Sequence, residues 1–319
     1  MIDALRFVQG ATKSIVLAPE LEHYQIKDGR IVGYNGFMAL SSPIDLEISA
    51  KPRAKLFHKA LQSCGDTVSI GMTPAGRLHV KSGGFSAFIP CREDEIYEAQ
   101  PTGVEFRAPG GMLAAMRRLY GLISVDASRP WAMGLSIGGG AYTATNNIAV
   151  VQVWEGHDLP TFNCPRFAVA ELIRIGQTPD SVRVDGNNSA TFQWDNGRWL
   201  QTQLLSADWP AELIAKLLAS GTPGQPIPEG FFEALEKIRP FIPDTSNTVC
   251  FAENRLIAGP HSEEISASHV VDGLPPGPRF SEKVLTALVK EIETIDFSAY
   301  PKPCGFRGPN SRGIILGQR

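Results

Sequence analysis

The sequence predicts an α+β fold built from three repeated domains, each with two amphipathic helices and several short antiparallel strands. One order of elements (helix, strands, second helix, further strands) recurs three times along the 319 residues, and such repetition indicates one structural unit used repeatedly. The second helices superpose on residues 59–61, 170–172 and 286–288, so successive repeats are offset by 111 (59 to 170) and 116 (170 to 286) residues. The last of these helices is expected near 281–293. The three segments share little sequence identity, so the regular spacing by itself could also arise by chance. A chain of this length is expected to hold two or three domains.

Alternating apolar and polar residues between turn residues predict short strands with one buried face. The expected strands are residues 67–70, 76–80 and 83–89 in the first segment, and 181–184, 190–194 and 199–202 in the second. Asn187-Asn188 and Asn196-Gly197 separate the strands of the second segment, and Asn-Gly is a strong hairpin signal because both residues accept a positive φ. These segments are therefore expected to form antiparallel hairpins.

Two connectors mark the expected domain boundaries. The first is the charged stretch Cys91 to Thr102, and the second is 220–228, where Gly and Pro interrupt helix and strand patterns alike. Boundaries near residues 102 and 224 give domains 1–102, 103–223 and 224–319.

The polar faces of the expected helices are mostly basic. In the helix around 51–64, a period of 3.6 residues sets Phe57 and Ala60 opposite Lys55 and Lys59. Cations repeated on several equivalent helices attract phosphates without reading base sequence. The candidate DNA-contacting residues are Arg6, Lys13, Lys51, Lys55, Lys59, Arg117, Arg118, Arg166, Arg174, Lys237, Lys283 and Lys290.

Two helices weaken this pattern. Arg166 and Arg174 are not cleanly segregated from apolar residues, and Lys237 lies among Glu233 and Glu236. For any one helix taken alone, an ordinary solvated face is the alternative.

Composition excludes binding of nucleic acid by bulk charge. The formal net charge is -3, so any DNA contact needs a local basic patch. The five cysteines lie far apart without paired CxxC spacing and are expected to be reduced thiols. Asp3 and Arg6 stand where a signal peptide needs an apolar run, and no stretch reaches the roughly 18 apolar residues of a membrane span. We expect a cytoplasmic protein.

No catalytic or metal-binding motif stands out. The six histidines lack HExxH spacing, and Gly138-Gly139-Gly140 lacks the Lys and Ser or Thr of a phosphate-binding loop, so it is interpreted as a hairpin turn. The pairs Asp94-Glu95 and Glu263-Glu264 point to opposite sides of an extended chain, and there is no GxSxG elbow. We expect a protein that is not an enzyme and uses no cofactor or metal. An enzyme of unfamiliar chemistry is the least favoured alternative.

Segments spread over the whole chain occur in the order typical of one family. They are Val104-Glu105-Phe106, Arg129-Pro130-Trp131-Ala132-Met133-Gly134-Leu135, Tyr142-Thr143-Ala144-Thr145-Asn146-Asn147, Trp209-Pro210, residues 248–256 and residues 313–319. Together they resemble the bacterial DNA polymerase III beta subunit, the DNA sliding clamp. The resemblance implies the DNA clamp fold, with inner helices and outer antiparallel sheets, and a head-to-tail homodimer that closes a ring around duplex DNA.

The same resemblance implies a pocket for a short linear motif of DNA polymerase and clamp loader. Matched piece by piece, its positions are Thr145, Val150, Pro210, Ile214, Ile314 and Leu316. For Val150, Ile214 and Ile314 an ordinary core position is the alternative. Where the family usually has an acid, a glycine and a basic pair, this chain has 146–149, Asn-Asn-Ile-Ala, and Gly317 replaces a common proline. These departures indicate a divergent clamp, with a phage origin left open.

The leading hypothesis is therefore a processivity factor that encircles double-stranded DNA without sequence specificity and tethers a replicative polymerase. An all-β-rich structural or assembly protein that does not bind DNA is the alternative from another class.

Overall fold

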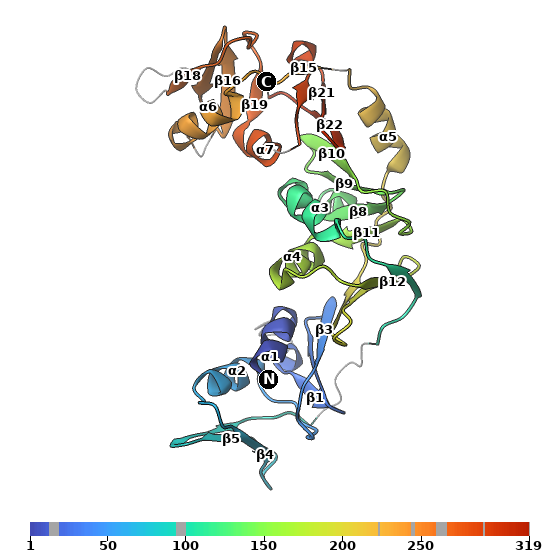
Figure 1. Cartoon of the computed structure of the whole chain (residues 1–319), viewed down its shortest axis with the longest axis vertical. Coiled ribbons are helices and arrows are strands. Elements are labelled where there is room, and N and C mark those ends of the chain that lie inside the picture. Colours follow the sequence, from blue (N-terminus) through green and yellow to red (C-terminus); the bar gives the residue numbers. More distant parts are fainter. Residues whose placement is uncertain are drawn as a thin grey trace. The chain divides into compact units, whose positions relative to one another are not determined.

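Short helices and antiparallel sheets make up the whole described chain (Figure 1). The computed structural model describes residues 1–12, 19–93, 100–222, 224–243, 246–259, 267–289 and 291–318. It divides into two compact units: residues 1–108 with 174–204, and residues 109–173 with 205–319. Among the described residues, no helix is both long enough and apolar enough to cross a membrane.

In its described residues, the first unit contains a seven-stranded and a three-stranded antiparallel sheet. The larger sheet has the order β1 (Gln25–Lys27), β2 (Arg30–Tyr34), β3 (Met38–Pro43), β14 (Trp199–Gln203), β13 (Ser189–Gln193), β12 (Ser181–Asp185) and β7 (Val104–Arg107). The smaller sheet has the order β4 (Ser69–Met72), β5 (Leu78–Ser82) and β6 (Phe85–Ile89). Strands from the first and middle thirds of the sequence thus share one sheet, through the pairing of β3 with β14.

Helices α1 and α2 pack on these sheets because each helix has an apolar face that is stable only when it is buried. Helix α1 (Ile2–Val8) lies on β3 and β2, and α2 (Ala54–Gln62) packs on α1 and β6. Phe7 of α1 meets Trp194 edge-on, with ring centroids 5.3 Å apart. The short 3-10 helices are η1 (Gln9–Ala11) and η2 (Pro19–Glu22).

The described part of the second unit contains an eight-stranded and a four-stranded antiparallel sheet. The larger sheet has the order β11 (Phe162–Pro165), β8 (Gly134–Gly138), β9 (Ala141–Thr145), β10 (Ala149–Trp154), β22 (Ser311–Ile315), β21 (Cys304–Arg307), β20 (Thr294–Ile295) and β15 (Gln225–Pro226). The smaller sheet has the order β18 (Ser268–Val270), β17 (Arg255–Ala258), β16 (Thr248–Ala252) and β19 (Arg279–Ser281). Here β10 pairs with β22, which joins the middle and last thirds of the sequence.

Among the residues that the structure describes, five α-helices belong wholly or mainly to the second unit. They are α3 (Met112–Leu119), α4 (Arg166–Ile175, whose last two residues fall in the first unit), α5 (Ala211–Ala219), α6 (Phe231–Ile238) and α7 (Glu282–Ala287). The 3-10 helices are η3 (Tyr120–Leu122), η4 (Pro130–Met133), η5 (Arg239–Phe241) and η6 (Phe297–Ala299). Under α6 the rings of Phe231, Phe251, Phe280 and Phe297 form a core, with centroid distances of 4.9 to 5.8 Å between contacting rings.

The local predictions from the sequence agree closely with these elements. All six expected strands are present within two residues of their predicted ends, and the Gly138-Gly139-Gly140 turn joins β8 to β9 with positive φ at all three glycines. Two expectations were wrong. The helix expected near 281–293 ends at Ala287, and Pro226 lies in a strand after all, because β15 is the edge of its sheet, where a missing N–H is tolerated. Each unit contains a sheet whose strands come from two thirds of the sequence. The division into three domains at residues 102 and 224 therefore stays a prediction.

Candidate nucleic-acid interface and peptide pocket

Helix α2 presents the clearest cationic face of the first unit. Phe57, Ala60 and Leu61 are buried, while Lys55 and Lys59 are exposed on the opposite side. The helix forms because these apolar positions recur at the helical period. Lys51 precedes the helix and is half-buried. The separation of faces expected from the sequence is therefore present.

A pocket of about 600 Å³ runs along the cationic side of α2. Besides Lys55 and Lys59, its lining includes Arg53, His58 and Arg174. Arg53 donates to Glu22 at 2.8 and 3.1 Å, and burial raises the pKa of Tyr24, another lining residue, to about 12. Arg53 and His58 were not among the residues predicted from the sequence. The helical spacing of 55, 58, 59 and 62 could have found His58, since these positions share one side of α2.

Two further predicted cations of the first unit, Arg6 and Arg174, form polar contacts with other residues of the same unit. Arg6 is exposed and forms a weak ion pair with Asp3 at 3.5 Å. Arg174, in the last turn of α4, donates to the main-chain oxygens of Arg6 and Phe7 at 2.9 and 2.8 Å. Arg174 therefore secures the end of α1 as well as adding charge beside it.

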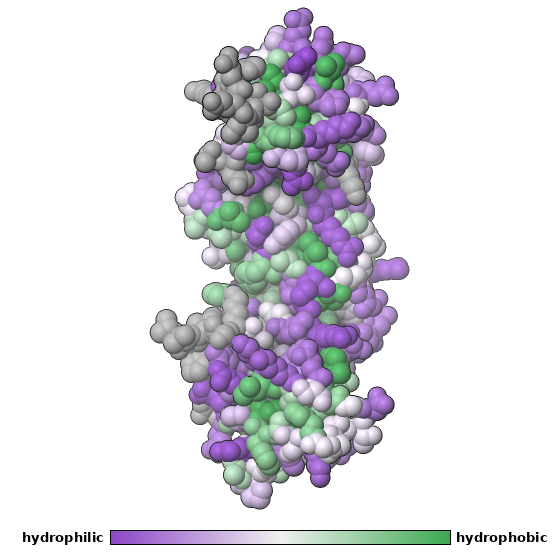
Figure 2. Space-filling view, turned by 90° about the vertical axis from the view of Figure 1, so that its left-hand side faces the viewer, coloured by the Kyte–Doolittle hydropathy of each residue, from purple (hydrophilic) through white to green (hydrophobic). Residues whose placement is uncertain are grey.

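The predicted cations of the second unit have diverse surroundings. Arg117 and Lys283 are exposed. The guanidinium of Arg166 lies 4.3 Å from the ring centroid of Tyr120, and Lys237 pairs with Glu233 at 2.7 Å. Figure 2 shows hydrophilic side chains over much of one face, intermixed with smaller hydrophobic areas. The predicted residues Lys13 and Lys290 lie outside the described residues.

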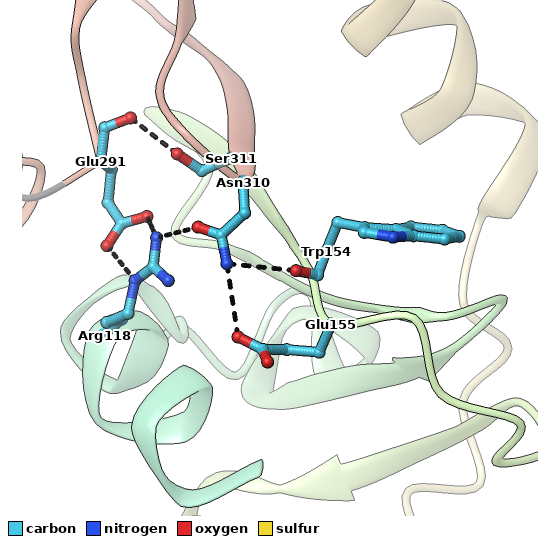
Figure 3. Close-up of polar contacts among 6 residues, drawn as sticks. All are labelled: Arg118, Trp154, Glu155, Glu291, Asn310 and Ser311. Atoms are coloured by element: carbon cyan, nitrogen blue, oxygen red, sulfur yellow. Dashed lines mark hydrogen bonds and ion pairs between the residues drawn. The ribbon is translucent and has the colours of Figure 1, made fainter. Parts of the chain in front are cut away.

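Arg118 differs from the other predicted cations because its guanidinium is turned into the protein (Figure 3). Its Nε and Nη2 donate to the two carboxylate oxygens of Glu291, each at 2.6 Å, and Nη2 also donates to Asn310 Oδ1 at 3.0 Å. Hydrogen bonds to Glu291 are the main reason why the pKa of Arg118 is raised. Such a forked pair is strong and directional.

An apolar pocket of about 180 Å³ lies between β9, β10, β22 and α5. Five of the six predicted pocket residues line it: Thr145, Val150, Ile214, Ile314 and Leu316. Pro210 does not; it stands at the start of α5, where its carbonyl accepts the N–H of Ile214 at 3.0 Å.

The pocket floor is a hydrophobic cluster built from strand and helix residues. Val150, Ile214, Leu218 and Ile314 are buried together, and Trp131, Trp209 and Leu217 pack against them. Val150 and Ile314 meet because they are paired residues of β10 and β22. Leu213, which the sequence analysis missed, also lines the pocket and is 53% exposed. Its place one turn before Leu217, another lining residue of α5, was the available signal, because residues four apart share one side of a helix.

The polar rim of the pocket is fixed by a tight turn. Thr145 Oγ1 donates to the carbonyl of Ala149 at 2.7 Å and accepts the N–H of Asn147 at 3.2 Å. Asn147 has a φ of 71°, a conformation that asparagine tolerates better than most residues. Arg129 Nη1 donates to Asn147 Oδ1 at 2.9 Å. The turn thus holds the Arg129 guanidinium at the rim of an apolar cavity.

Two strands lie at the edges of their sheets with large apolar side chains exposed. Phe88 of β6 is 57% exposed and stacks on His79 with a centroid distance of 4.4 Å. Val270 of β18 is also 57% exposed. Unpaired edges of this kind can pair with a strand of another chain.

Comparison with known proteins assigns the fold. No family model matches the sequence, and none of the curated proteins matches it. Solved structures do match: the chain has the fold of the bacterial DNA polymerase sliding clamps, the beta subunits of DNA polymerase III. The clamp fold predicted from the sequence is therefore confirmed.

Three of these structures illustrate the likeness. The sliding clamp of Bacillus subtilis aligns with a TM-score of 0.83 at 17% identity, over 100% of this chain and 96% of that one. The beta sliding clamp of Caulobacter crescentus gives 0.82 at 14% identity, over 100% and 96%. The sliding clamp of Pseudomonas aeruginosa bound to griselimycin gives 0.80 at 16% identity, over 100% and 97%. The low identities describe a chain far diverged in sequence within a shared fold.

Proposed function

We propose that this chain is a DNA sliding clamp, a processivity factor that is not an enzyme, encircles double-stranded DNA and tethers a replicative polymerase. The observation that carries the proposal is the match of the whole chain, 100% of its length, to sliding clamps at TM-scores near 0.8. A clamp acts where DNA is replicated, so we infer a cytoplasmic place of action.

The proposed DNA contact is electrostatic and independent of sequence. Lys55, Lys59 and Arg117 are its best-supported members, because they are exposed on helices whose opposite faces are buried. Long, mobile cations on helix surfaces attract phosphates without fixing a register. Such contacts hold a duplex weakly enough for sliding.

The proposed assembly is a head-to-tail homodimer that closes a ring. Its support is the pair of edge strands β6 and β18, which lie in different units and carry the exposed Phe88 and Val270. A head-to-tail contact joins two different surfaces, and it closes when the rotation between subunits permits. We propose that β6 of one subunit pairs with β18 of its partner.

The proposed partner site is the apolar pocket around Val150 and Ile314. Its lining fits an aliphatic or aromatic anchor of a short peptide segment, since such anchors gain most of their binding energy from desolvated pockets. We propose that DNA polymerase and the clamp loader each carry such a segment.

Retention on DNA after loading by the cognate loader tests the whole proposal. The protein is loaded onto nicked circular plasmid, half of the sample is linearised, and both are passed through a gel-filtration column at a salt concentration that screens phosphate contacts. Topological encirclement predicts retention on circles and loss from linear DNA. Equal loss from both forms, with a monomeric protein by sedimentation, would favour the structural-protein alternative.

A further inference from the structure

Strand β22 brings Ile314, and Leu316 directly after its end, to the peptide pocket, so its register on β10 determines the shape of that pocket. The paired backbone runs from one end, where the Leu316 N–H donates to the Ile148 carbonyl at 2.7 Å, to the other, where the Trp154 N–H donates to the Asn310 carbonyl at 2.8 Å. A slip of one residue would turn Ile314 to the opposite face of the sheet. The pocket therefore depends on how firmly both ends of β22 are held.

The end of β22 away from the pocket is held by two side chains: Asn310, in the turn before the strand, and Ser311, the first residue of the strand (Figure 3). Asn310 Nδ2 donates to the carbonyl of Trp154 at 3.2 Å and lies 3.4 Å from Glu155 Oε1. Ser311 Oγ donates to the main-chain oxygen of Glu291 at 2.7 Å. The turn is thus attached to β10, and the first residue of β22 is attached to the segment after α7.

Arg118 of α3 connects these two attachments. Its side chain is 22% exposed and that of Glu291 is 1% exposed, so the forked pair gives a buried carboxylate its cation. The third bond, from Arg118 Nη2 to Asn310 Oδ1, fixes the orientation of the Asn310 amide. Removing the guanidinium would leave a buried carboxylate without its cation and an amide oxygen without its donor, both of which are strongly unfavourable.

The local charge at Arg118 does not favour a DNA phosphate. One cation faces two carboxylates, those of Glu291 and Glu155, and the charge of Glu155 is a further cause of the raised pKa of Arg118. Arg117, the next residue along α3, is exposed instead. Two adjacent arginines of one helix therefore have opposite surroundings.

We propose that Arg118 is a positioning residue for the peptide pocket and not a DNA contact: with Glu291 and Asn310 it pins the turn before β22, and so keeps Ile314 and Leu316 in register beside Val150. The expected effect on peptide binding rests on the proposed function of the pocket. The expected ordering of β22 by Arg118 is independent of that function.

Hydrogen exchange measured by mass spectrometry on the full-length protein tests the ordering directly, with no ligand present. In Arg118→Gln we expect exchange across residues 304–316 to rise about tenfold or more, the loss expected for charge-assisted bonds of this kind, with β16 and β17 unchanged. Glu291→Gln, which keeps the shape of the side chain, is expected to act on the same residues. Arg255→Gln, an exposed charge on β17, is the matched control and leaves residues 304–316 unchanged.

Two binding measurements then separate positioning from DNA contact. The first uses a fluorescent peptide that carries one aliphatic and one aromatic anchor. Arg118→Gln should weaken the affinity of the protein for this peptide about tenfold, because β22 is held less firmly in register. On duplex DNA, Arg117→Gln should weaken binding and Arg118→Gln should not. If Arg118→Gln does not fold, Arg118→Lys replaces it, because lysine keeps the charge but cannot form the forked pair.

Unchanged exchange in residues 304–316, or a loss of DNA binding in Arg118→Gln equal to that in Arg117→Gln, would overturn the proposal. If the unaltered protein binds neither peptide nor DNA, the proposed clamp function fails, while the exchange measurement still decides whether Arg118 orders β22.

Discussion

Val150 and Ile314 face each other across the antiparallel pair of β10 and β22, although 164 residues (150 to 314) separate them in the sequence. Both side chains belong to one buried cluster and both line the same pocket. Because both strands contribute lining residues, the pocket exists only when the middle and last thirds of the chain are joined. Binding at this pocket and stability of the joint are therefore linked.

Leu213→Ala separates peptide binding from stability at this pocket. Leu213 lines the pocket but is 53% exposed, so its truncation should weaken binding of an apolar-anchored peptide by about 1 to 2 kcal/mol while changing the free energy of unfolding by about 0.5 kcal/mol or less. Fluorescence anisotropy and urea denaturation measure the two quantities. Val125→Ala, a more exposed apolar residue outside the pocket lining, is the control, and an equal loss of peptide affinity there would contradict the assignment.

Ile314→Ala should affect both quantities. The side chain is buried in the pocket floor, and removal of such a core side chain costs about 2 to 5 kcal/mol of folding free energy. We expect a lower urea midpoint together with weaker peptide binding. Unchanged stability would mean that the cluster around Val150 is not a packed core in solution.

The double variant Lys55→Gln with Lys59→Gln tests the cationic face of α2. If both side chains contact phosphates, the slope of log Kobs against log salt on duplex DNA should fall in magnitude by about 1.8, since each contact contributes about 0.9. The affinity should fall alike for unrelated DNA sequences. Lys81→Gln, an exposed lysine on β5, should leave the slope unchanged, and a slope unaltered in the double variant would remove α2 from the interface.

Phe88→Asp tests the proposed subunit contact at β6. Phe88 is largely exposed, so the monomer should fold, but an aspartate there would place an unpaired charge in an apolar contact. Sedimentation equilibrium should show a dimer for the unaltered protein and a monomer for the variant. Val104→Asp, at an exposed position of β7, is the matched control, and a dimer that survives Phe88→Asp would place the subunit contact elsewhere.

Stability should fall at alkaline pH because of Tyr24. Burial raises the pKa of Tyr24 from 10.0 to about 12, so the folded state keeps its proton where the unfolded state loses it. The neutral Tyr24 therefore contributes fully to the free energy of unfolding below pH 10. This contribution, about 3 kcal/mol in all, is lost as the pH rises towards 12. Urea denaturation between pH 9 and 12 should therefore give a flatter dependence for Tyr24→Phe than for the unaltered protein. Burial shifts the pKa of Tyr142 in the same direction, so some dependence should remain in the variant.

The sequence by itself determined the elements whose signals are local. The buried and exposed faces of α2 follow from a period of 3.6 residues, and the hairpin of β13 and β14 follows from Asn196-Gly197, because turn chemistry and side-chain period act over a few residues. The order of segments along the chain was enough to predict the clamp fold and to select five residues that prove to line one pocket.

Only the tertiary structure decided what the polar side chains contact. Helical period places Arg117 and Arg118 alike on the polar side of α3, yet one is exposed and the other pairs with Glu291, 173 residues further along the chain. Likewise, Pro210 fell outside the pocket lining while Leu213 fell within it, one turn later on α5. Periodicity fixes which side of a helix a residue occupies, but the partner that meets that side comes from a distant segment, and its place is set by the packing of the whole unit.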